Sequence, residues 1–105
     1  MVKQFDVFLV SLDPTQGSEI QKTRPALIVS PNELNRHLQT VIIAPMTTAF
    51  KNYPSRVEIT FQGKDGNIAL DQIRAIDKTR LVKYLGDISE DTQIATLETL
   101  QKMFK

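Results

Sequence analysis

The sequence predicts a mainly β fold of the α+β class, in which a strongly bent antiparallel sheet or half-open barrel carries one helix at its C-terminal end. Two observations predict it. Short runs of apolar and β-branched residues alternate with turn residues over most of the chain, and the hydrophobic spacing changes to a helical period near the end. Because 105 residues can enclose one modest core, we expect a single domain, residues 1–105, with about five to seven strands.

The first half of the chain predicts three strands and one short helical turn. Residues 5–12 (FDVFLVSL) are largely apolar at both alternating sets of positions, which indicates a strand buried on both faces. Residues 26–30 (ALIVS) and 40–46 (TVIIAPM) are two further β-branched runs. A helical turn that starts at Pro31 or Asn32 would connect them.

The second half predicts a hairpin and a helix. In residues 56–61 (RVEITF), apolar and polar side chains alternate, as in a strand with one face in water. Residues 63–67 (GKDGN) supply hairpin-type turn residues before residues 68–76 (IALDQIRAI). A helix is expected after a Ser89 cap, and it would close the domain with an apolar stripe. The residues of that stripe are Ile94, Leu97, Leu100 and Phe104.

The composition excludes several kinds of site. The chain has no cysteine, which removes disulfides, thiolate metal sites and cysteine nucleophiles, and its one histidine, His37, is expected at the surface. We therefore expect no metal and no cofactor. The formal net charge is +1, so any anion site must be local. The N-terminal apolar run is broken by Asp6 and too short to cross a bilayer, which favours a cytoplasmic protein without a membrane partner.

Arg24 lies at the junction between a polar loop and a strand. Residues 13–23 (DPTQGSEIQKT) are long for a hairpin connection, and loops of this kind are commonly functional. Pro25 biases Arg24 to an extended conformation, so the guanidinium is held on a rigid element beside the loop. Its planar fork of donors suits a phosphate. The alternative is structural, with Arg24 pairing to Glu19 or Asp13 and fastening the loop.

A second polar segment, residues 44–54 (APMTTAFKNYP), follows a strand end. The hydroxyls of Thr47 and Thr48 can donate to phosphate oxygens, Lys51 adds positive charge, and Tyr53 can stack on a base. The alternative is an ordinary turn in which the threonines bond to the local backbone and Tyr53 is half buried.

With these residues in place, the chain resembles the MazF/PemK family of type II toxin endoribonucleases along nearly its whole length. The motifs that carry the resemblance are VFLVSLDPTQGSEIQKTRPALIVSP (residues 7–31), VIIAPMTT (41–48), YPSRVEI (53–59) and IALDQIRAI (68–76). The resemblance implies an SH3-like antiparallel β-barrel of the CcdB/PemK type, with a C-terminal helix. It also implies a homodimer that cuts single-stranded RNA, usually mRNA at short sequences, without a metal. A partly disordered antitoxin would neutralise it.

The resemblance also implies site residues. Arg24 of the RPA motif and Thr47 after the AP strand end carry over as catalytic positions, and in some members the glutamate of GSE, here Glu19, also matters. Attack of the 2′-hydroxyl on its own phosphate would give a 2′,3′-cyclic phosphate and a 5′-hydroxyl. Glu19 is the candidate base, although it could equally orient Arg24. Antitoxin binding would compete for Arg24 and Lys51.

RNA recognition is expected from the two polar segments. The candidate RNA-binding residues are Gln16, Ser18, Lys22, Thr48, Lys51, Tyr53 and Gln72. Asp71 beside Gln72 could also line the groove, but an Asp-Gln pair on a strand more often anchors local backbone.

Two other functions share this fold. A CcdB-like poison of DNA gyrase is disfavoured. Resemblance to that family would imply a C-terminal tail in which a tryptophan determines killing, and this chain has no tryptophan. A non-catalytic SH3-like binding module is disfavoured because Arg24, Thr47 and Glu19 are all present. Dimerisation would cover apolar edges such as residues 41–45 (VIIAP).

Overall fold

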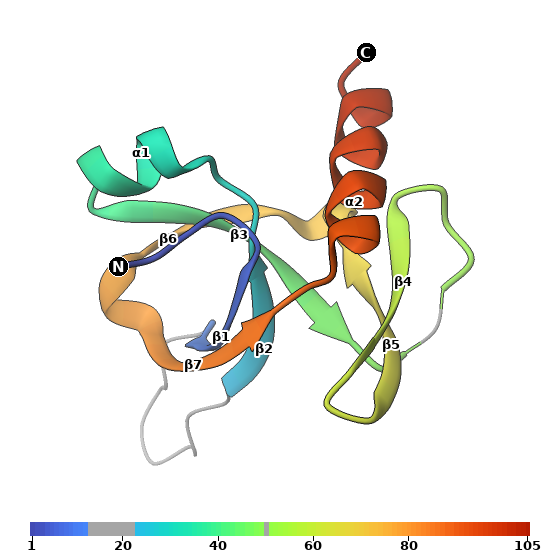
Figure 1. Ribbon diagram of the computed structural model, residues 1–105, viewed down its shortest axis with the longest axis horizontal. Coiled ribbons are helices and arrows are strands. Elements are labelled where there is room, and N and C mark those ends of the chain that lie inside the picture. Colours follow the sequence, from blue (N-terminus) through green and yellow to red (C-terminus); the bar gives the residue numbers. More distant parts are fainter. Residues whose placement is uncertain (13–22, 50) are drawn as a thin grey trace.

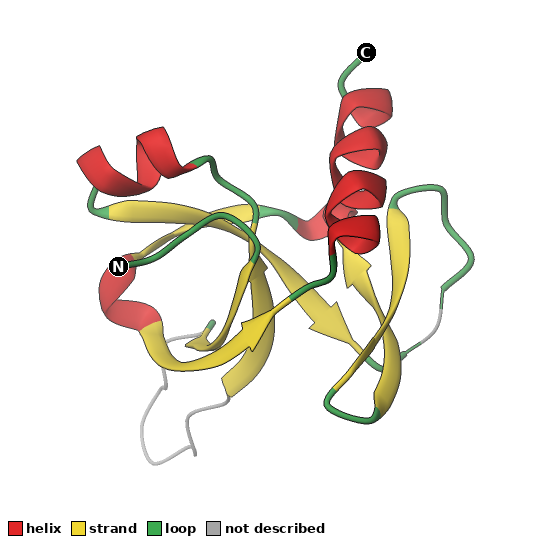
Figure 2. Cartoon of the chain, viewed as in Figure 1, coloured by secondary structure: helices red, strands yellow, loops and turns green. Residues whose placement is uncertain are grey.

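A computed structural model gives the fold and describes residues 1–12, 23–49 and 51–105. In this part of the chain the strands are β1 (Asp6–Ser11), β2 (Thr23–Ile28), β3 (Thr40–Thr47), β4 (Arg56–Phe61), β5 (Lys64–Ala69), β6 (Arg74–Asp77) and β7 (Leu81–Asp87). The α-helices are α1 (Asn32–His37) and α2 (Glu90–Met103), and two 3₁₀ turns are η1 (Leu70–Gln72) and η2 (Lys78–Arg80). Both α-helices stand on the same side of the sheet in the view of Figure 2.

The strands pair in the order β4-β5-β3-β2-β1-β7, and β6 adds to β3. Every pair is antiparallel, and the sheet curls so that β4 and β7 lie on opposite sides of the opening that α2 occupies (Figure 1). The predicted half-open antiparallel barrel with a C-terminal helix is therefore confirmed. The short helix between β2 and β3 is also confirmed, with Pro31 as its N-cap.

The core has two parts because the curled sheet buries side chains on both faces. Alternate residues of β1 enter different clusters, since Val7 packs in one and Val10 in the other, and both are fully buried. This confirms the prediction that the first strand is buried on both faces. The larger cluster lies beneath α2 and includes Leu27, Ile68 and Leu70.

The central position of β3 corrects one expectation. Residues 41–45 were expected to form an apolar edge that a second subunit could cover. Instead β3 pairs with β2 on one side and with β6 and then β5 on the other, so this segment lies inside the sheet. Its β-branched side chains are used within the fold.

The hairpin between β4 and β5 turns earlier than expected. Gln62 and Gly63 both have positive φ, 51° and 78°, as in a two-residue turn of the primed type. Lys64 and Asp65 then pair with Phe61 and Thr60, so most of the predicted turn belongs to β5. Gly63 is the turn glycine, and the glycine at position 66 has a different role, described below.

The helix α2 is confirmed, but its buried face is not the predicted one. Ser89 caps it by accepting a hydrogen bond from the Thr92 backbone N–H. Thr96 is the fully buried residue, and its hydroxyl donates to the Thr92 carbonyl, so a small satisfied side chain lets the helix approach the sheet closely. Of the predicted stripe only Leu100 packs against the core. The others, Ile94, Leu97 and Phe104, are 48%, 40% and 72% exposed.

Candidate functional site

The end of the β2–β3 ladder creates the site. The register pairs Ile28 with Ile43, Leu27 with Ala44 and Ala26 with Pro45, and pairing stops there. Pro25 and Pro45 have no backbone N–H. Since the Val29 N–H donates to the Ile42 carbonyl, the alternation of an antiparallel pair assigns the missing N–H of Pro25 to the β2–β3 ladder and that of Pro45 to the other side of β3. Beyond this point β3 changes partner, and Thr47 pairs with Asn67 of β5.

Arg24 and Thr47 lie on the two strand ends that separate at this point. Continuing the β2–β3 register would place them opposite each other, because Ala26 faces Pro45 and each is two residues further along. On its other side Arg24 pairs with Val10 of β1, so its backbone is held in the sheet while its side chain is exposed. A fixed cation and a hydroxyl therefore face one opening.

This opening is a groove of about 420 Å³. Its floor contains the apolar side chains of Met46, Ile59 and Phe61, and polar residues surround them. The polar residues that line it, among those described, are Arg24, Thr47, Thr48, Gln62, Lys64, Asp65 and Asn67. An apolar floor with convergent polar groups is the usual construction of a ligand site, and two cations against one carboxylate favour an anionic ligand.

Gly66 allows the site to be this compact. A Cβ at Gly66 would lie 2.3 Å from the Thr47 carbonyl oxygen and 3.1 Å from its carbonyl carbon. A Cβ does not approach an oxygen to 2.3 Å, so only glycine lets β5 approach the Thr47 backbone to this distance. The sequence pattern predicted that Gly66 belongs to a hairpin turn and gave no sign of its role in the site.

The Thr47 hydroxyl oxygen makes a hydrogen bond to the local backbone. This contact was the structural alternative to a role in binding phosphate. The Ala49 backbone N–H donates to Thr47 Oγ1 at 3.1 Å, closing a short turn at the end of β3. A threonine hydroxyl accepts through lone pairs and donates through its own hydrogen, so this bond does not use the O–H of Thr47. The structural and the functional interpretation of Thr47 are therefore compatible.

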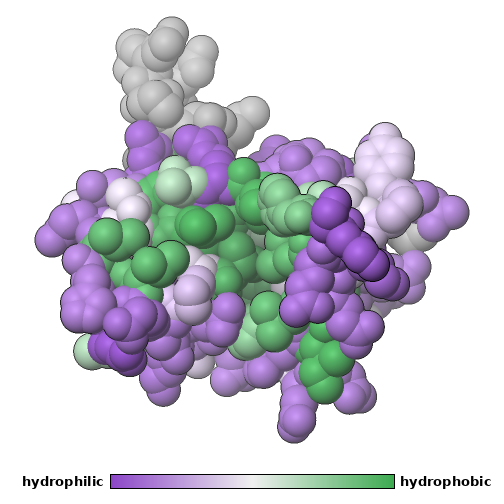
Figure 3. Space-filling view, turned by 90° about the horizontal axis from the view of Figure 1, so that it is seen from above, coloured by the Kyte–Doolittle hydropathy of each residue, from purple (hydrophilic) through white to green (hydrophobic). Residues whose placement is uncertain are grey.

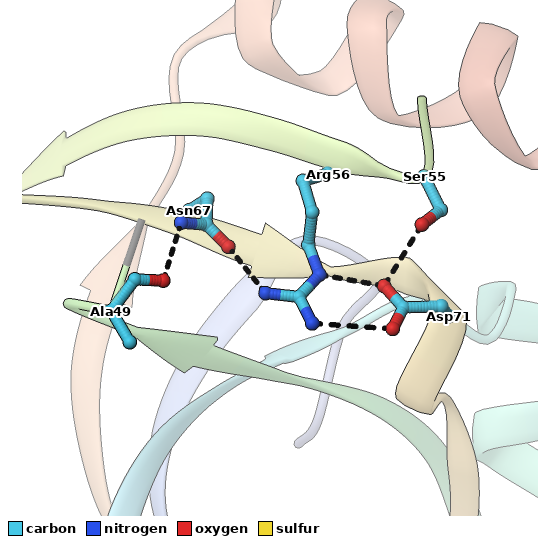
Figure 4. A network of polar contacts seen from close by, with 5 residues as sticks. All are labelled: Ala49, Ser55, Arg56, Asn67 and Asp71. Carbon is cyan, nitrogen blue, oxygen red and sulfur yellow. Dashed lines mark hydrogen bonds and ion pairs between the residues drawn. The ribbon is translucent and has the colours of Figure 1, made fainter. Parts of the chain in front are cut away.

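A polar network extends from Asn67, in the groove lining, to Ala49, whose N–H donates to Thr47 (Figure 4 shows the part from Asp71 to Ala49). The Arg56 guanidinium donates from Nε and Nη2 to the two carboxylate oxygens of Asp71, at 2.6 and 3.2 Å, and Ser55 Oγ donates to the same carboxylate at 2.9 Å. Arg56 Nη1 also donates to Asn67 Oδ1 at 3.0 Å, and Asn67 Nδ2 donates to the Ala49 carbonyl at 3.1 Å. The network thus joins β4, β5, η1 and the segment after β3.

The Arg56–Asp71 contact shifts the protonation equilibria of both groups. The hydrogen bond from Arg56 is the largest cause of the lowered pKa of Asp71, with burial opposing it and Ser55 adding to it. The same hydrogen bond raises the pKa of Arg56. The Arg56 side chain is 7% exposed and the Asp71 side chain 33% exposed, so the pair is a partly buried structural anchor. Asp71 lies on a 3₁₀ turn and anchors the distant side chains of Arg56 and Ser55, whereas the alternative expected an anchor of local backbone on a strand.

The remaining predicted residues divide into two groups. Lys51, Tyr53 and Gln72 are exposed but lie outside the lining of the groove, and the Tyr53 ring stacks on Arg56 with its centroid 5.3 Å from the guanidinium carbon. His37 is at the surface as expected, with 70% of its side chain exposed. The other group, Gln16, Ser18, Glu19 and Lys22, lies outside the described residues. The proposed partners of Arg24 in the loop lie there too.

Sequence reasoning missed the contribution of the β4–β5 hairpin to the groove. Its alternation was interpreted only as a strand with one wet face, whereas Ile59 and Phe61 form part of the groove floor and Lys64 and Asp65 its rim. Position along the chain gave no signal for this, because the hairpin meets β3 only through the change of strand partner at Met46.

The comparisons with known proteins agree with this geometry. Over residues 3–104 the chain matches the family described as "PemK-like, MazF-like toxin of type II toxin-antitoxin system". It is also 38% identical, over 100 residues, to the protein named Endoribonuclease MazF of Staphylococcus epidermidis, covering 90% of this chain and 83% of that one. The chain belongs to the MazF/PemK family. The expected family and its class, endoribonuclease toxins, are therefore confirmed.

Solved structures of MazF toxins share the fold. An endoribonuclease in complex with its cognate antitoxin, from a mycobacterial species, superimposes with a TM-score of 0.84 at 26% identity, covering 99% of this chain and 95% of that one. The MazE–MazF complex of Deinococcus radiodurans gives a TM-score of 0.83 at 24% identity, with 98% and 95% covered. In the described part of this MazF/PemK member, neither α-helix has the length and apolarity needed to cross a bilayer.

Proposed function

We propose that this MazF/PemK member is the toxin of a type II toxin–antitoxin pair that cuts single-stranded RNA, in particular mRNA, at specific sequences without a metal ion. The observation that carries the proposal is the groove that Arg24 and Thr47 both line, beside the point where the pairing of β2 and β3 stops. A cation and a hydroxyl on rigid strands are the groups that stabilisation of a phosphorane needs.

The proposed reaction is an internal transesterification. The 2′-oxygen of the ribose forms a bond to the adjacent phosphorus while the bond from phosphorus to the 5′-oxygen breaks, leaving a 2′,3′-cyclic phosphate and a 5′-hydroxyl. A base accepts the 2′-hydroxyl proton, and the departing 5′-oxygen gains one. Arg24 would bind the non-bridging oxygens through its planar fork, and the Thr47 hydroxyl would donate to one of them. Glu19 is our candidate base.

RNA would follow the groove away from this pair. Thr48 lies in its lining, and the apolar floor of Ile59 and Phe61 offers a surface on which an unpaired base can stack. We propose that the exposed side chains of Lys51, Tyr53 and Gln72 contact the strand as it leaves the groove, and that Gln16, Ser18 and Lys22 contact it as well. Bases read on both sides would give sequence specificity.

The partners proposed for the toxin are a cognate antitoxin and a second copy of the chain. The mycobacterial and Deinococcus relatives were each solved with an antitoxin, which supports such a partner here. An acidic extended or helical antitoxin segment would compete with RNA for Arg24 and Lys51. Cleavage that stays unchanged at saturating antitoxin would contradict this competition. The chain would act in the cytoplasm, where mRNA is found, with residues 1–105 as one toxin domain.

The exposed apolar side chains of α2 support the homodimer. Ile94, Leu97, Met103 and Phe104 are all more than one third exposed. Figure 3 shows apolar side chains gathered across the middle of the face seen from above, the side that bears α1 and α2. Burial of such a surface favours association of two copies. We therefore propose this surface as the dimer interface, in place of the strand edge of residues 41–45 that the sequence predicted.

The chemistry is tested by mapping and then altering the cut site. The purified protein is incubated in EDTA with a long unstructured RNA, and the ends are mapped. An oligonucleotide with 2′-deoxyribose at the mapped nucleotide is then compared with the all-ribose strand. We expect discrete cuts with cyclic phosphate ends, and no cut in the deoxy substrate, which should still bind. Cleavage of the deoxy substrate, or cleavage only with added divalent metal, would contradict the mechanism.

A further inference from the structure

The hydrogen-bond network that reaches Thr47 through Ala49 suggests additional residues for the proposed reaction. Arg56 and Asn67 lie on β4 and β5, outside the two polar segments that carry the predicted site. Neither was singled out by its position in the sequence. Both are buried, with Asn67 1% exposed and the Arg56 side chain 7% exposed. Buried polar side chains that are fully hydrogen-bonded hold their neighbours in one arrangement.

Hydrogen bonds on either side of the Ala49 main chain connect Arg56 with the Thr47 hydroxyl. Arg56 donates to Asn67 Oδ1 at 3.0 Å, Asn67 Nδ2 donates to the Ala49 carbonyl at 3.1 Å, and the Ala49 N–H donates to Thr47 Oγ1 at 3.1 Å. The Asp71 carboxylate fixes the other side of the guanidinium. We call this path the Arg56 relay, and Figure 4 shows its part from Asp71 to Ala49.

The direction of each bond in the Arg56 relay follows from the chemistry of its members. Arginine has only donors, so the atom of Asn67 that faces it must be the carbonyl oxygen. The amide NH₂ of Asn67 must then face Ala49, where it meets a carbonyl that can accept. The Ala49 carbonyl belongs to the peptide after this residue and the Ala49 N–H to the peptide before it, so the bond from Asn67 holds the Ala49 main chain, whose N–H in turn donates to Thr47 Oγ1. One lone pair of that oxygen is thereby occupied, which restricts the directions in which its O–H can donate.

We propose that Arg56 and Asn67 are positioning residues that set the Thr47 hydroxyl for transition-state stabilisation. This inference rests on the proposed function, because it assigns a purpose to the orientation of a catalytic hydroxyl. Donors that stabilise a transition state act best when their direction is fixed before the reaction. The close approach of Gly66 to the Thr47 carbonyl holds the same residue from its backbone, so Thr47 is constrained on two sides.

The decisive variant is Asn67→Asp. A carboxylate at this position still accepts from Arg56 but cannot donate to the Ala49 carbonyl, so the relay breaks at one bond with almost no change in shape. We expect kcat to fall by roughly tenfold to a hundredfold, with KM within about threefold of wild type, as for loss of an interaction made in the transition state.

Asn35→Asp is the matched control. Asn35 of α1 is also 1% exposed, accepts from Ser30 Oγ and donates to the Ser30 carbonyl, and it lies outside the lining of the groove. The two variants bury the same new carboxylate, so both should lose thermal stability. At a temperature where each is folded, only Asn67→Asp should lower kcat. Arg56→Lys keeps the positive charge but removes the planar guanidinium with its several N–H donors. It should therefore also interrupt the Arg56 relay and lower kcat.

A double-mutant cycle with Thr47→Val separates positioning from a general structural effect. If Asn67 acts through Thr47, Asn67→Asp should change the rate of Thr47→Val by less than about twofold in single-turnover cleavage. An equal loss in both backgrounds would overturn the relay, as would wild-type kcat in both Asn67→Asp and Arg56→Lys. Failure of the proposed function gives a different result, since wild type would then cleave no RNA or Thr47→Val would be fully active.

Discussion

The close contact between β5 and Thr47 gives a sharp prediction for Gly66→Ala. Van der Waals contact is ordinary from 3.4 Å, and the new Cβ would start at 2.3 Å from the Thr47 carbonyl oxygen, so the two strands must separate by about 1 Å. Overpacking of this kind costs about 1–3 kcal/mol of folding free energy. Displacing a catalytic group by about 1 Å can cost roughly a hundredfold in rate.

Gly63→Ala is the matched substitution on the same hairpin. A Cβ at Gly63 meets nothing within 4 Å, but the positive φ of 78° strains any L side chain by about 1 kcal/mol. Both variants should therefore unfold at a lower temperature, and only Gly66→Ala should move Thr47. Thermal denaturation and single-turnover RNA cleavage, measured below the transition of either variant, separate the two effects.

We expect Gly66→Ala to cleave roughly tenfold to a hundredfold more slowly than Gly63→Ala. A folded Gly66→Ala protein with the cleavage rate of wild type would refute the reasoning, because it would show that the Thr47 backbone can move by this distance without effect. Equal losses in the two variants would also refute it, since a strained turn would then account for both.

Three further predictions concern stability, assembly and the helix cap. Because Arg56 lowers the folded-state pKa of Asp71, the stability that this carboxylate contributes is present above the ordinary pKa of about 3.9 and is lost as the pH falls through the lower folded value. The difference in unfolding free energy between wild type and Asp71→Asn should accordingly shrink in urea titrations from pH 7 to pH 2, and a constant difference would contradict this. Ile94→Glu should convert a dimer to a monomer in analytical ultracentrifugation with little loss of stability, since Ile94 is 48% exposed in the chain, and an unchanged dimer would place the interface elsewhere. Ser89→Ala should lower the stability by about 1 kcal/mol, seen as a fall of about 4–8 °C in Tm, because the helix loses the cap contact to the Thr92 N–H; an unchanged Tm would show that this cap adds nothing.

Local patterns predicted the elements well where one chemical signal decided them. The apolar run in residues 5–12, the alternation in residues 56–61 and the Ser89 cap each predicted an element whose type its neighbours in the fold do not change. The same signals did not predict packing. Spacing alone placed an apolar stripe of α2 against the core, whereas the fold buries Thr96, because a small residue permits the closest approach of helix and sheet.

The site itself was predicted only in part. Arg24 was singled out because it stands between a polar loop and Pro25, and Thr47 because its hydroxyl follows an apolar strand; the family resemblance supplied their catalytic roles. That the two ends face one groove follows from the register of β2 and β3, which depends on contacts across the sheet. The Arg56–Asp71 pair could not be predicted at all, since it joins residues fifteen apart that meet only after the hairpin has folded.

The central claim is that Arg24 contributes its charge to RNA cleavage. The most direct measurement is single-turnover cleavage of a mapped RNA in EDTA by wild type and by Arg24→Ala, Arg24→Lys and Arg74→Ala, the last removing an exposed arginine of β6 outside the groove lining. We expect wild type and Arg74→Ala to produce cyclic phosphate ends. Arg24→Ala should cleave at a rate at least about a hundredfold lower, and Arg24→Lys should keep partial activity. Full activity of folded Arg24→Ala, or intact RNA with wild type, would contradict the claim.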